Sequence, residues 1–349
     1  MNTAAACHAY TPPFWLAGGH LQTIIPSLFH QGPDIQYHRQ RWELADGDFI
    51  DVDWTAAEPL AVTPACSTKK LDVSDVAFSR DTECSQPVMV IFHGLEGNSQ
   101  SQYVKSVLAS ALAKGWLGVV IHFRGCSGEP NRLPRTYYAG DSAEIELMLA
   151  RVRARYPLNP LYAVGYSLGG NALLKWLGEF GHSQRLPITK AVAVSAPMDL
   201  KASALSIDSG LNRIFYSRMF LNSMRPKALA MAKRFPGLLN ERSIINANTI
   251  QDMDNAVTAV LYGAKSAVDY YHKNAAKPYL NNINLPTLII SAKNDPFMPA
   301  KFLPTADEVS ASVTLDYQAK GGHVGFFAPR PRQAHGWLAH RIIEFLEHD

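Results

Sequence analysis

Short apolar runs alternate with amphipathic stretches from about residue 87 towards the end of the chain. The apolar runs are rich in aliphatic side chains, and each ends in small or polar residues. Such runs are typical of strands that are buried on both faces of a parallel sheet. They cover residues 87–94, 115–125, 161–167, 190–197 and 286–295.

The stretches between these runs have the pattern of helices. One ends at Gly115, which suits a helix C-terminus, and another opens with Asp141 or Ser142 as N-cap and stops at Pro157. The helices are expected at residues 101–115, 141–157 and 171–181. This alternation predicts an α/β fold with a mostly parallel central sheet.

Two regions near the N-terminus depart from the alternation. Residues 37–54 alternate polar and apolar positions on either side of Asp46-Gly47, which predicts an antiparallel hairpin. Residues 55–86 are polar and weakly periodic, and the pattern leaves their structure open beyond a surface loop.

The alternation stops again after Asp199, where the chain is helical in pattern until about Pro278. A helical insert within a sheet protein is typical of a cap over the carboxyl edge of the sheet, where such folds hold their ligands. The predicted organisation is an α/β core with a helical cap inserted in it. Its parts are the core at residues 1–199 and 280–349, with an N-terminal arm over about residues 1–36, and the cap at residues 200–279.

Composition adds several exclusions. The 349 residues are 47% hydrophobic and 18% charged, with a formal charge of +3 and no dense basic block. Arg151, Arg153 and Arg155 are spread around a predicted helix as a solvated face, so nucleic-acid binding is not expected. The four cysteines are far apart without C-x-x-C spacing, which argues against a zinc knuckle and a disulfide scaffold.

The N-terminal residues lack the pattern of a signal peptide, and no window reaches the about 18 apolar residues of a membrane span. We therefore expect a cytoplasmic protein without an integral membrane segment. Transient contact with a lipid surface and the oligomeric state stay open.

The most informative stretch is Gly165-Tyr166-Ser167-Leu168-Gly169, which matches G-x-S-x-G. An apolar strand leads into it and a helix leaves it, which is the setting of a nucleophile elbow. We therefore predict Ser167 as a catalytic nucleophile. A serine hydroxyl needs a base, and that base needs an orienting group.

In this type of site the acid and then the histidine follow the serine along the chain. Asp295 follows an aliphatic run and precedes Pro296, and His323 follows an alternating run before the last amphipathic helix. We predict these two as the acid and the base. Asp199, which also ends a strand, is the competing acid, whereas Asp141 has the position of a helix cap.

A tetrahedral oxyanion requires two backbone N–H donors. Leu168, directly after the nucleophile, and Leu95, in the loop after the first buried run, are the candidates. His93 precedes that loop, and we expect it to hold the loop in place. No metal or cofactor motif is present, so neither is expected.

These motifs together resemble the α/β-hydrolase superfamily, and in detail its YheT-like branch, the AB hydrolase 4 family. The matching stretches are FWLAGGHLQTI, DGDFIDVDW, HGLEGNSQSQYV, HFRGCSGEPN, GYSLGGNALLKWLGE, DYYHKNAA and NDPFMP. The resemblance implies a serine hydrolase that acts on carboxylic esters or acylglycerol-type lipids, with Ser167, Asp295 and His323 as its triad. Residues 63–86 are longer than the resemblance leads us to expect.

The Gly-Gly-His that ends at His20 marks this branch but lies outside the order serine, acid, histidine. We interpret His20 as structural, with substrate contact as the alternative. Arg124 is expected to anchor a loop through ion pairs, and Cys126 to be buried. Tyr270 and Tyr271 either pack the helices or line an acyl pocket.

The predicted reaction is a two-step acyl transfer from a small-molecule ester through an acyl-enzyme. Other acyl chemistry on the same triad, by a thioesterase, acyltransferase or peptidase, is the first alternative. A non-catalytic binding protein with a hydrolase fold is the second.

Overall fold

The structure is a computed structural model that describes residues 9–29, 31–55, 86–181, 183, 186–327 and 336–348. Its centre is an eight-stranded sheet in the order β1-β2-β4-β3-β5-β6-β7-β8. All pairs from β4 to β8 are parallel, whereas β1 pairs with β2 and β2 with β4 in antiparallel fashion. The strands are β1 (His38–Glu43), β2 (Phe49–Trp54), β3 (Val88–Phe92), β4 (Leu117–Ile121), β5 (Leu161–Tyr166), β6 (Lys190–Val194), β7 (Thr287–Ala292) and β8 (Val313–Gln318).

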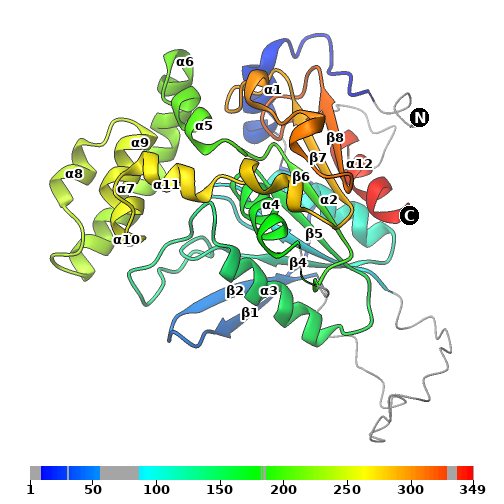
Figure 1. Cartoon of the computed structure of the whole chain (residues 1–349), viewed down its shortest axis with the longest axis horizontal. Helices are drawn as coiled ribbons and strands as arrows, with labels where there is room; N and C mark the ends of the chain where they lie inside the picture. The colour runs from blue at the N-terminus through cyan, green and yellow to red at the C-terminus, as the bar shows by residue number, and fades with distance from the viewer. Residues whose placement is uncertain are drawn as a thin grey trace, which may run out of the picture.

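Helices cover both faces of the sheet, as the predicted α/β fold requires (Figure 1). Successive side chains of a strand point to opposite faces. In β3, Val90 and Phe92 therefore pack on one face and Met89 and Ile91 on the other. The first face is covered by α3 (Ser142–Arg155) and α4 (Leu168–Phe180), and the second by α2 (Gln102–Ala113) and α12 (Trp337–Glu347).

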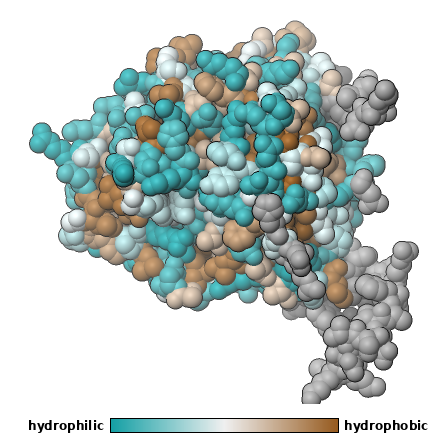
Figure 2. Space-filling view, viewed as in Figure 1, coloured by the Kyte–Doolittle hydropathy of each residue, from teal (hydrophilic) through white to brown (hydrophobic). Residues whose placement is uncertain are grey.

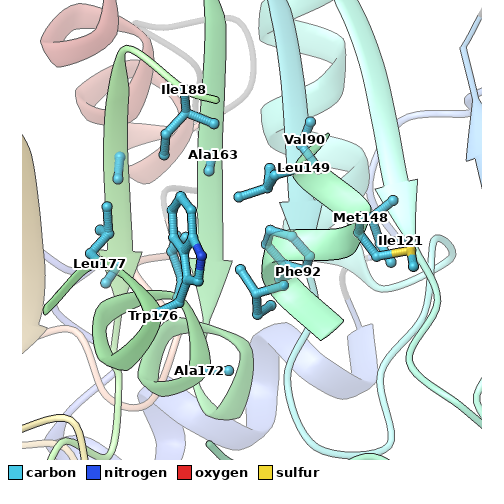
Figure 3. Close-up of a cluster of buried hydrophobic side chains, with 14 of the residues drawn as sticks. Val90, Phe92, Ile121, Met148, Leu149, Ala163, Ala172, Trp176, Leu177 and Ile188 are labelled. Atoms are coloured by element: carbon cyan, nitrogen blue, oxygen red, sulfur yellow. The ribbon is translucent and has the colours of Figure 1, made fainter. Parts of the chain in front are cut away.

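Figure 3 shows the first of these two layers. Trp176 of α4 is fully buried and lies over the strands, in the same layer as the aliphatic side chains of α3. Such packing fixes α4 against the sheet, so the residue at the start of α4 is held rigidly.

The predicted hairpin is confirmed. β1 and β2 pair from His38 opposite Trp54 to Glu43 opposite Phe49, and the turn between them contains Gly47 at φ +85°. Of the predicted loop at residues 55–86, residues 56–85 lie outside the described residues.

Residues 200–282 lie between β6 and β7, and this helical segment contains no strand. Most of its helices stand together beyond one end of the sheet (Figure 1). They are α5 (Leu200–Ile207), α6 (Gly210–Asn212), η2 (Arg213–Ser217), α7 (Arg218–Arg234), α8 (Glu241–Asn246), α9 (Ile250–Met253), η3 (Asp254–Thr258), α10 (Ala259–Leu261), α11 (Ala267–Asn274) and η4 (Lys277–Asn282). Part of the segment has a small apolar core of its own, with Leu221, Ile244 and Met253 at its centre.

The N-terminal arm contains a helix that the pattern did not predict, α1 (Gly18–Phe29). Two short 3-10 turns, η5 (Ala300–Phe302) and η6 (Ala306–Glu308), complete the elements. None of the helices in the described residues is both long and apolar enough to cross a membrane.

Candidate active site

Ser167 stands at the sharp turn between β5 and α4. Its backbone has φ +48° and ψ −119°, a strained conformation for a residue with a side chain. The turn needs glycine on both sides. A Cβ atom at Gly165 would lie 2.6 Å from the carbonyl oxygen of Gly169, and one at Gly169 would lie 2.5 Å from the carbonyl oxygens of Phe92 and His93. Strand, turn and helix together aim the Ser167 hydroxyl at the carboxyl edge of the sheet.

Two more of the side chains singled out from the sequence lie beside that hydroxyl. His323, in the loop after β8, has its Nε2 atom 2.9 Å from Ser167 Oγ and its Nδ1 atom 2.9 Å from Asp295 Oδ2. Asp295, in the loop after β7, is 5% exposed. An imidazole with its proton on Nδ1 donates to Asp295 and accepts from the serine hydroxyl.

Further contacts hold the acid and the imidazole in place. The backbone N–H of Phe297 donates to Asp295 Oδ1 at 2.7 Å, and the Phe297 ring packs against the His323 ring at 4.1 Å between centroids. The residue that follows His323 in the chain is also held, because the backbone N–H of Val324 donates to Ser195 Oγ at 3.0 Å. The three side chains therefore form a chain of hydrogen bonds with little freedom to separate.

The competing carboxylates are used elsewhere. Asp199 caps α5 by accepting a hydrogen bond from the N–H of Ala202. Asp141 caps α3 through the N–H of Glu144 and pairs with Arg135 at 2.8 Å. Within the described residues, neither carboxylate forms a hydrogen bond or ion pair with His323.

The backbone amides of Leu95 and Leu168 both belong to segments that border Ser167. Leu168 is the first residue of α4, so its N–H has no acceptor within the helix. Leu95 follows Gly94, where a Cβ atom would lie 3.2 Å from Ser167 Cβ. In the described part of the chain, no hydrogen-bond acceptor is found for the Leu95 N–H.

His93 anchors the loop that carries Leu95, as expected. Its Nδ1–H donates to the carbonyl of Gly94 at 2.8 Å, and its Nε2 accepts from the N–H of Phe123 at 3.1 Å. Complete burial lowers the pKa of His93 to about 3, so the imidazole is neutral and can donate one hydrogen bond while it accepts the other.

Glu96 ties the same loop to the helical segment. It has φ +57°, and its N–H donates to the hydroxyl of Tyr137 at 2.8 Å. Its carboxylate accepts hydrogen bonds from Tyr137 and from Ser223 of α7, and pairs with Lys227 of α7 at 2.8 Å. Sequence reasoning missed this contact, because nothing in the pattern places α7 beside residues 94–97.

A cavity of about 680 Å³ opens beside Leu95 and Leu168. Its wall is formed mainly by the loop after β4 and by α7, with apolar side chains in the majority. Examples are Leu133, Tyr137, Met224, Met231, Phe235 and Val257. The cavity is large enough for a small organic group and is apolar enough to favour a hydrocarbon chain.

The first Gly-Gly-His lies against the second. Gln22 Oε1 accepts hydrogen bonds from Asn294 and from the N–H of Gly321, and Thr23 Oγ1 accepts one from the N–H of His323 at 2.9 Å. α1 therefore holds both loops that carry Asp295 and His323. Gln22 and Thr23 were missed from the sequence, although the motif that contains them was singled out.

His20 itself stacks on Tyr216 of η2, with its Nδ1 atom 3.1 Å from the tyrosine hydroxyl. This contact joins α1 to the helical segment and agrees with the structural interpretation. Among the described residues, His20 forms no hydrogen bond with Ser167 or Asp295.

The remaining predicted residues have structural contacts. Arg124 forms ion pairs with Asp46, Asp48 and Glu144, and so anchors its loop to the hairpin and α3. Cys126 is buried, which raises the pKa of its thiol to about 12 and makes it unreactive.

Tyr270 and Tyr271 are both buried in the helical packing. Tyr270 accepts a hydrogen bond from the N–H of Ala139 and also lines the cavity. Tyr271 donates to Asp254 at 2.7 Å. Both tyrosines therefore pack the helices, and Tyr270 also lines the cavity.

Residues 87–328 match the family model described as alpha/beta hydrolase fold. Among curated proteins, "Putative esterase YheT" of Escherichia coli (strain K12) is 36% identical over 99% of this chain and 95% of its own. The human "Phospholipase ABHD3" is 27% identical over 91% of this chain and 73% of its own. The "Monoacylglycerol lipase" of Saccharomyces cerevisiae is 29% identical over 95% of this chain and 79% of its own.

Solved structures show the same fold at low sequence identity. The Pyrococcus furiosus esterase PF2001 superimposes with a TM-score of 0.53 at 14% identity, covering 89% of this chain and 91% of its own. An esterase of Exiguobacterium antarcticum superimposes with a TM-score of 0.53 at 15% identity, covering 89% of this chain and 100% of its own. These likenesses concern the fold alone.

Proposed function

This chain belongs to the α/β-hydrolase fold family, and on that premise we propose that it is a serine hydrolase that cleaves carboxylic esters through an acyl-enzyme. The observation that carries the proposal is the imidazole of His323, which lies 2.9 Å from both Ser167 Oγ and Asp295 Oδ2. Esterase, lipase and phospholipase names among its relatives support ester hydrolysis as the reaction.

In the proposed first step, the Ser167 hydroxyl attacks the ester carbonyl while His323 Nε2 accepts its proton. Asp295 stabilises the imidazolium and keeps the ring oriented. The negative charge that develops on the carbonyl oxygen is stabilised by the N–H groups of Leu95 and Leu168. His323 then returns its proton to the departing alcohol, which leaves Ser167 acylated.

In the second step, water attacks the acyl-enzyme and His323 again accepts a proton. Collapse of the second tetrahedral intermediate releases the carboxylic acid and restores the Ser167 hydroxyl. Every proton transfer in this scheme uses a side chain of the protein, so the proposal needs no cofactor.

The helical segment has the part of a cap in this proposal. Residues 200–279 form the cap, and residues 1–199 and 280–349 form the hydrolase core, with the arm of about residues 1–36 beside it. α7 supplies one wall of the apolar cavity next to Leu95 and Leu168, where the acyl group would lie. Short- to medium-chain acyl esters or acylglycerol-type lipids are the proposed substrates, and a cytoplasmic location stays a prediction from the sequence.

Two tests separate this proposal from its alternatives. A series of p-nitrophenyl esters of increasing acyl length should be hydrolysed by the native protein, and Ser167→Ala should lower kcat by at least about 10⁴-fold. Equal rates for both proteins would refute Ser167 as nucleophile. A fluorophosphonate probe should label the native protein and not Ser167→Ala. Failure to label the folded native protein would favour a binding protein.

The type of acyl chemistry is decided by comparing an aryl ester, an acyl thioester and an amide at equal concentration. The ester should have the highest kcat/KM. A preference for the thioester or the amide would instead support a thioesterase or a peptidase that uses the same three side chains.

A further inference from the structure

α1 is a surface helix without a polar face. Residues 9–33 contain no Asp, Glu, Lys or Arg. Gln22 and Pro26 face the protein, while Leu21, Leu28 and Phe29 face solvent. Leu28 is 66% exposed and Phe29 is 75% exposed. An exposed helix normally has charged residues on its outer face, so this one is unusual for a helix that only meets water.

A second exposed apolar stripe begins the helical segment's longest helical run. Leu211, Ile214, Phe215 and Met219 recur every three or four residues through α6, η2 and the start of α7, and each is more than half exposed. The opposite side of the same run is buried, through Tyr216 and Phe220. Figure 2 shows hydrophobic side chains gathered at the surface over α6.

The helices that carry the two stripes contact each other. His20 of α1 stacks on Tyr216 of η2, and Ile24 of α1 packs against the cluster that contains Tyr216 and Phe297. Phe297 in turn contacts the ring of His323. α1 and the α6–η2–α7 run therefore meet through their inner side chains beside the candidate active site, and we call their exposed stripes together the apolar rim.

The exposed stripe of α6, η2 and the start of α7 has two basic residues, Arg213 and Arg218, and no acidic one, and the segment around it is basic. Residues 200–240 hold seven lysines and arginines but a single acid, Asp208. Asp208 is occupied by the hydroxyl of Ser217 and by the N–H groups of Ile250 and Gln251. Arg213 and Arg218 are exposed, and neither has a partner among the described residues.

We propose that the apolar rim docks this protein on the surface of an anionic phospholipid bilayer. The exposed Leu, Ile, Phe and Met side chains would enter the boundary between headgroups and acyl chains, while Arg213 and Arg218 pair with lipid phosphates. A soluble acidic peptide would engage the cations but leave the uncharged face of α1 bare. The proposal extends the proposed ester hydrolysis by bringing the site to lipid substrates, but the binding itself does not depend on catalysis.

The test is sedimentation of the full chain carrying Ser167→Ala with vesicles of equal parts phosphatidylcholine and phosphatidylglycerol. This protein should sediment with these vesicles, and weakly with phosphatidylcholine alone. Arg213→Glu/Arg218→Glu should weaken binding by at least about tenfold, because each basic residue near the surface contributes a several-fold gain. Leu211→Ser/Ile214→Ser/Phe215→Ser should weaken binding to a similar degree, and the binding that remains should still fall when salt is added, because both arginines are kept.

Matched controls carry the same changes elsewhere. Lys233→Glu/Arg242→Glu reverses two exposed charges, one in the last turn of α7, about 22 Å along the helix from Arg218, and one in α8. Leu158→Ser removes an exposed apolar side chain, 69% accessible, from the loop before β5. Both controls should bind as the parent does, and thermal melts should show that all variants are folded.

Three results would overturn the proposal. One is that the parent protein stays in the supernatant with anionic vesicles, and a second is that controls and rim variants lose binding equally. The third is sedimentation velocity showing a dimer that the triple variant dissociates, because a second copy of this chain would then cover the rim. None of these outcomes bears on ester hydrolysis, which is measured with soluble p-nitrophenyl esters and intact Ser167.

Discussion

The two Gly-Gly-His segments have the same three residues, lie against each other and have different surroundings. His323, which follows β8, meets Ser167 on one side and Asp295 on the other. His20, within α1, meets a tyrosine of the helical segment, and its neighbours Gln22 and Thr23 hold the loop of His323. The same three residues thus give an imidazole different roles, because His323 follows a strand that ends beside Ser167 and Asp295, whereas His20 lies within a helix.

The difference in role between the two histidines is tested most directly by removing each imidazole. His323→Ala should lower kcat for a p-nitrophenyl ester by about 10⁴-fold, because the serine loses its base. His20→Ala should lower it by less than about tenfold, because it removes only a contact between α1 and η2. Comparable losses in steady-state assays would show that the two histidines are not distinct in role.

The glycines before His20 offer a test of packing between the segments. A Cβ atom at Gly19 would lie 1.8 Å from the carbonyl oxygen of Asn294, so Gly19→Ala should cost about 3 kcal/mol of unfolding free energy. Gly18→Ala is the control, since it meets nothing within 4 Å and only its φ of +81° is strained. It should cost about 1 kcal/mol in the same denaturant titration.

A third histidine, His93, extends the comparison to a fully enclosed imidazole. Its folded pKa of about 3 lies below the ordinary value of 6.5, so the folded state binds fewer protons than the unfolded state. Stability that is present above pH 6.5 is then lost as pH falls, by about 2 kcal/mol at about pH 5. His93→Gln keeps a donor and an acceptor and should remove this slope.

Denaturant titrations of the native protein and of His93→Gln between about pH 7 and pH 5 measure the difference. Other titrating groups, including Asp254, whose pKa is raised to about 6 by burial, cancel in that difference. Parallel curves would show that His93 is not the buried, uncharged anchor described above.

The smallest expected effect concerns the support that α1 gives to His323. Thr23→Val removes the acceptor of the His323 N–H and should lower kcat about tenfold with KM nearly unchanged, because the imidazole is less well placed. Thr23→Ser keeps the hydroxyl and should restore most of the rate. Loss of stability without this rescue would indicate a packing role alone.

Much of the fold could be predicted because apolar runs and caps report local structure faithfully. The hairpin about Gly47, the parallel strands and the elbow at Ser167 all follow from short patterns with a steric cause. The positions of Asp295 and His323 follow from the rule that carboxyl ends of parallel strands share an edge.

The parts that escaped prediction depend on contacts between distant segments. α1 lacks the alternation of a polar and an apolar face and contains Pro26, so its sequence does not look like a surface helix. Gln22 reaches residues almost three hundred positions away, at Gly321. The link between Glu96 and α7 likewise exists only once the helical segment has folded against the loop.

That link couples the size of a bound acyl group to the position of the Leu95 N–H. Glu96 follows Leu95 directly, and its carboxylate is joined to Ser223 and Lys227 of α7. An acyl group too bulky for the cavity would have to displace α7. Because α7 is bonded to Glu96, this displacement would move the Leu95 N–H away from the reacting carbonyl. Oversized acyl groups would consequently turn over slowly even when they bind well.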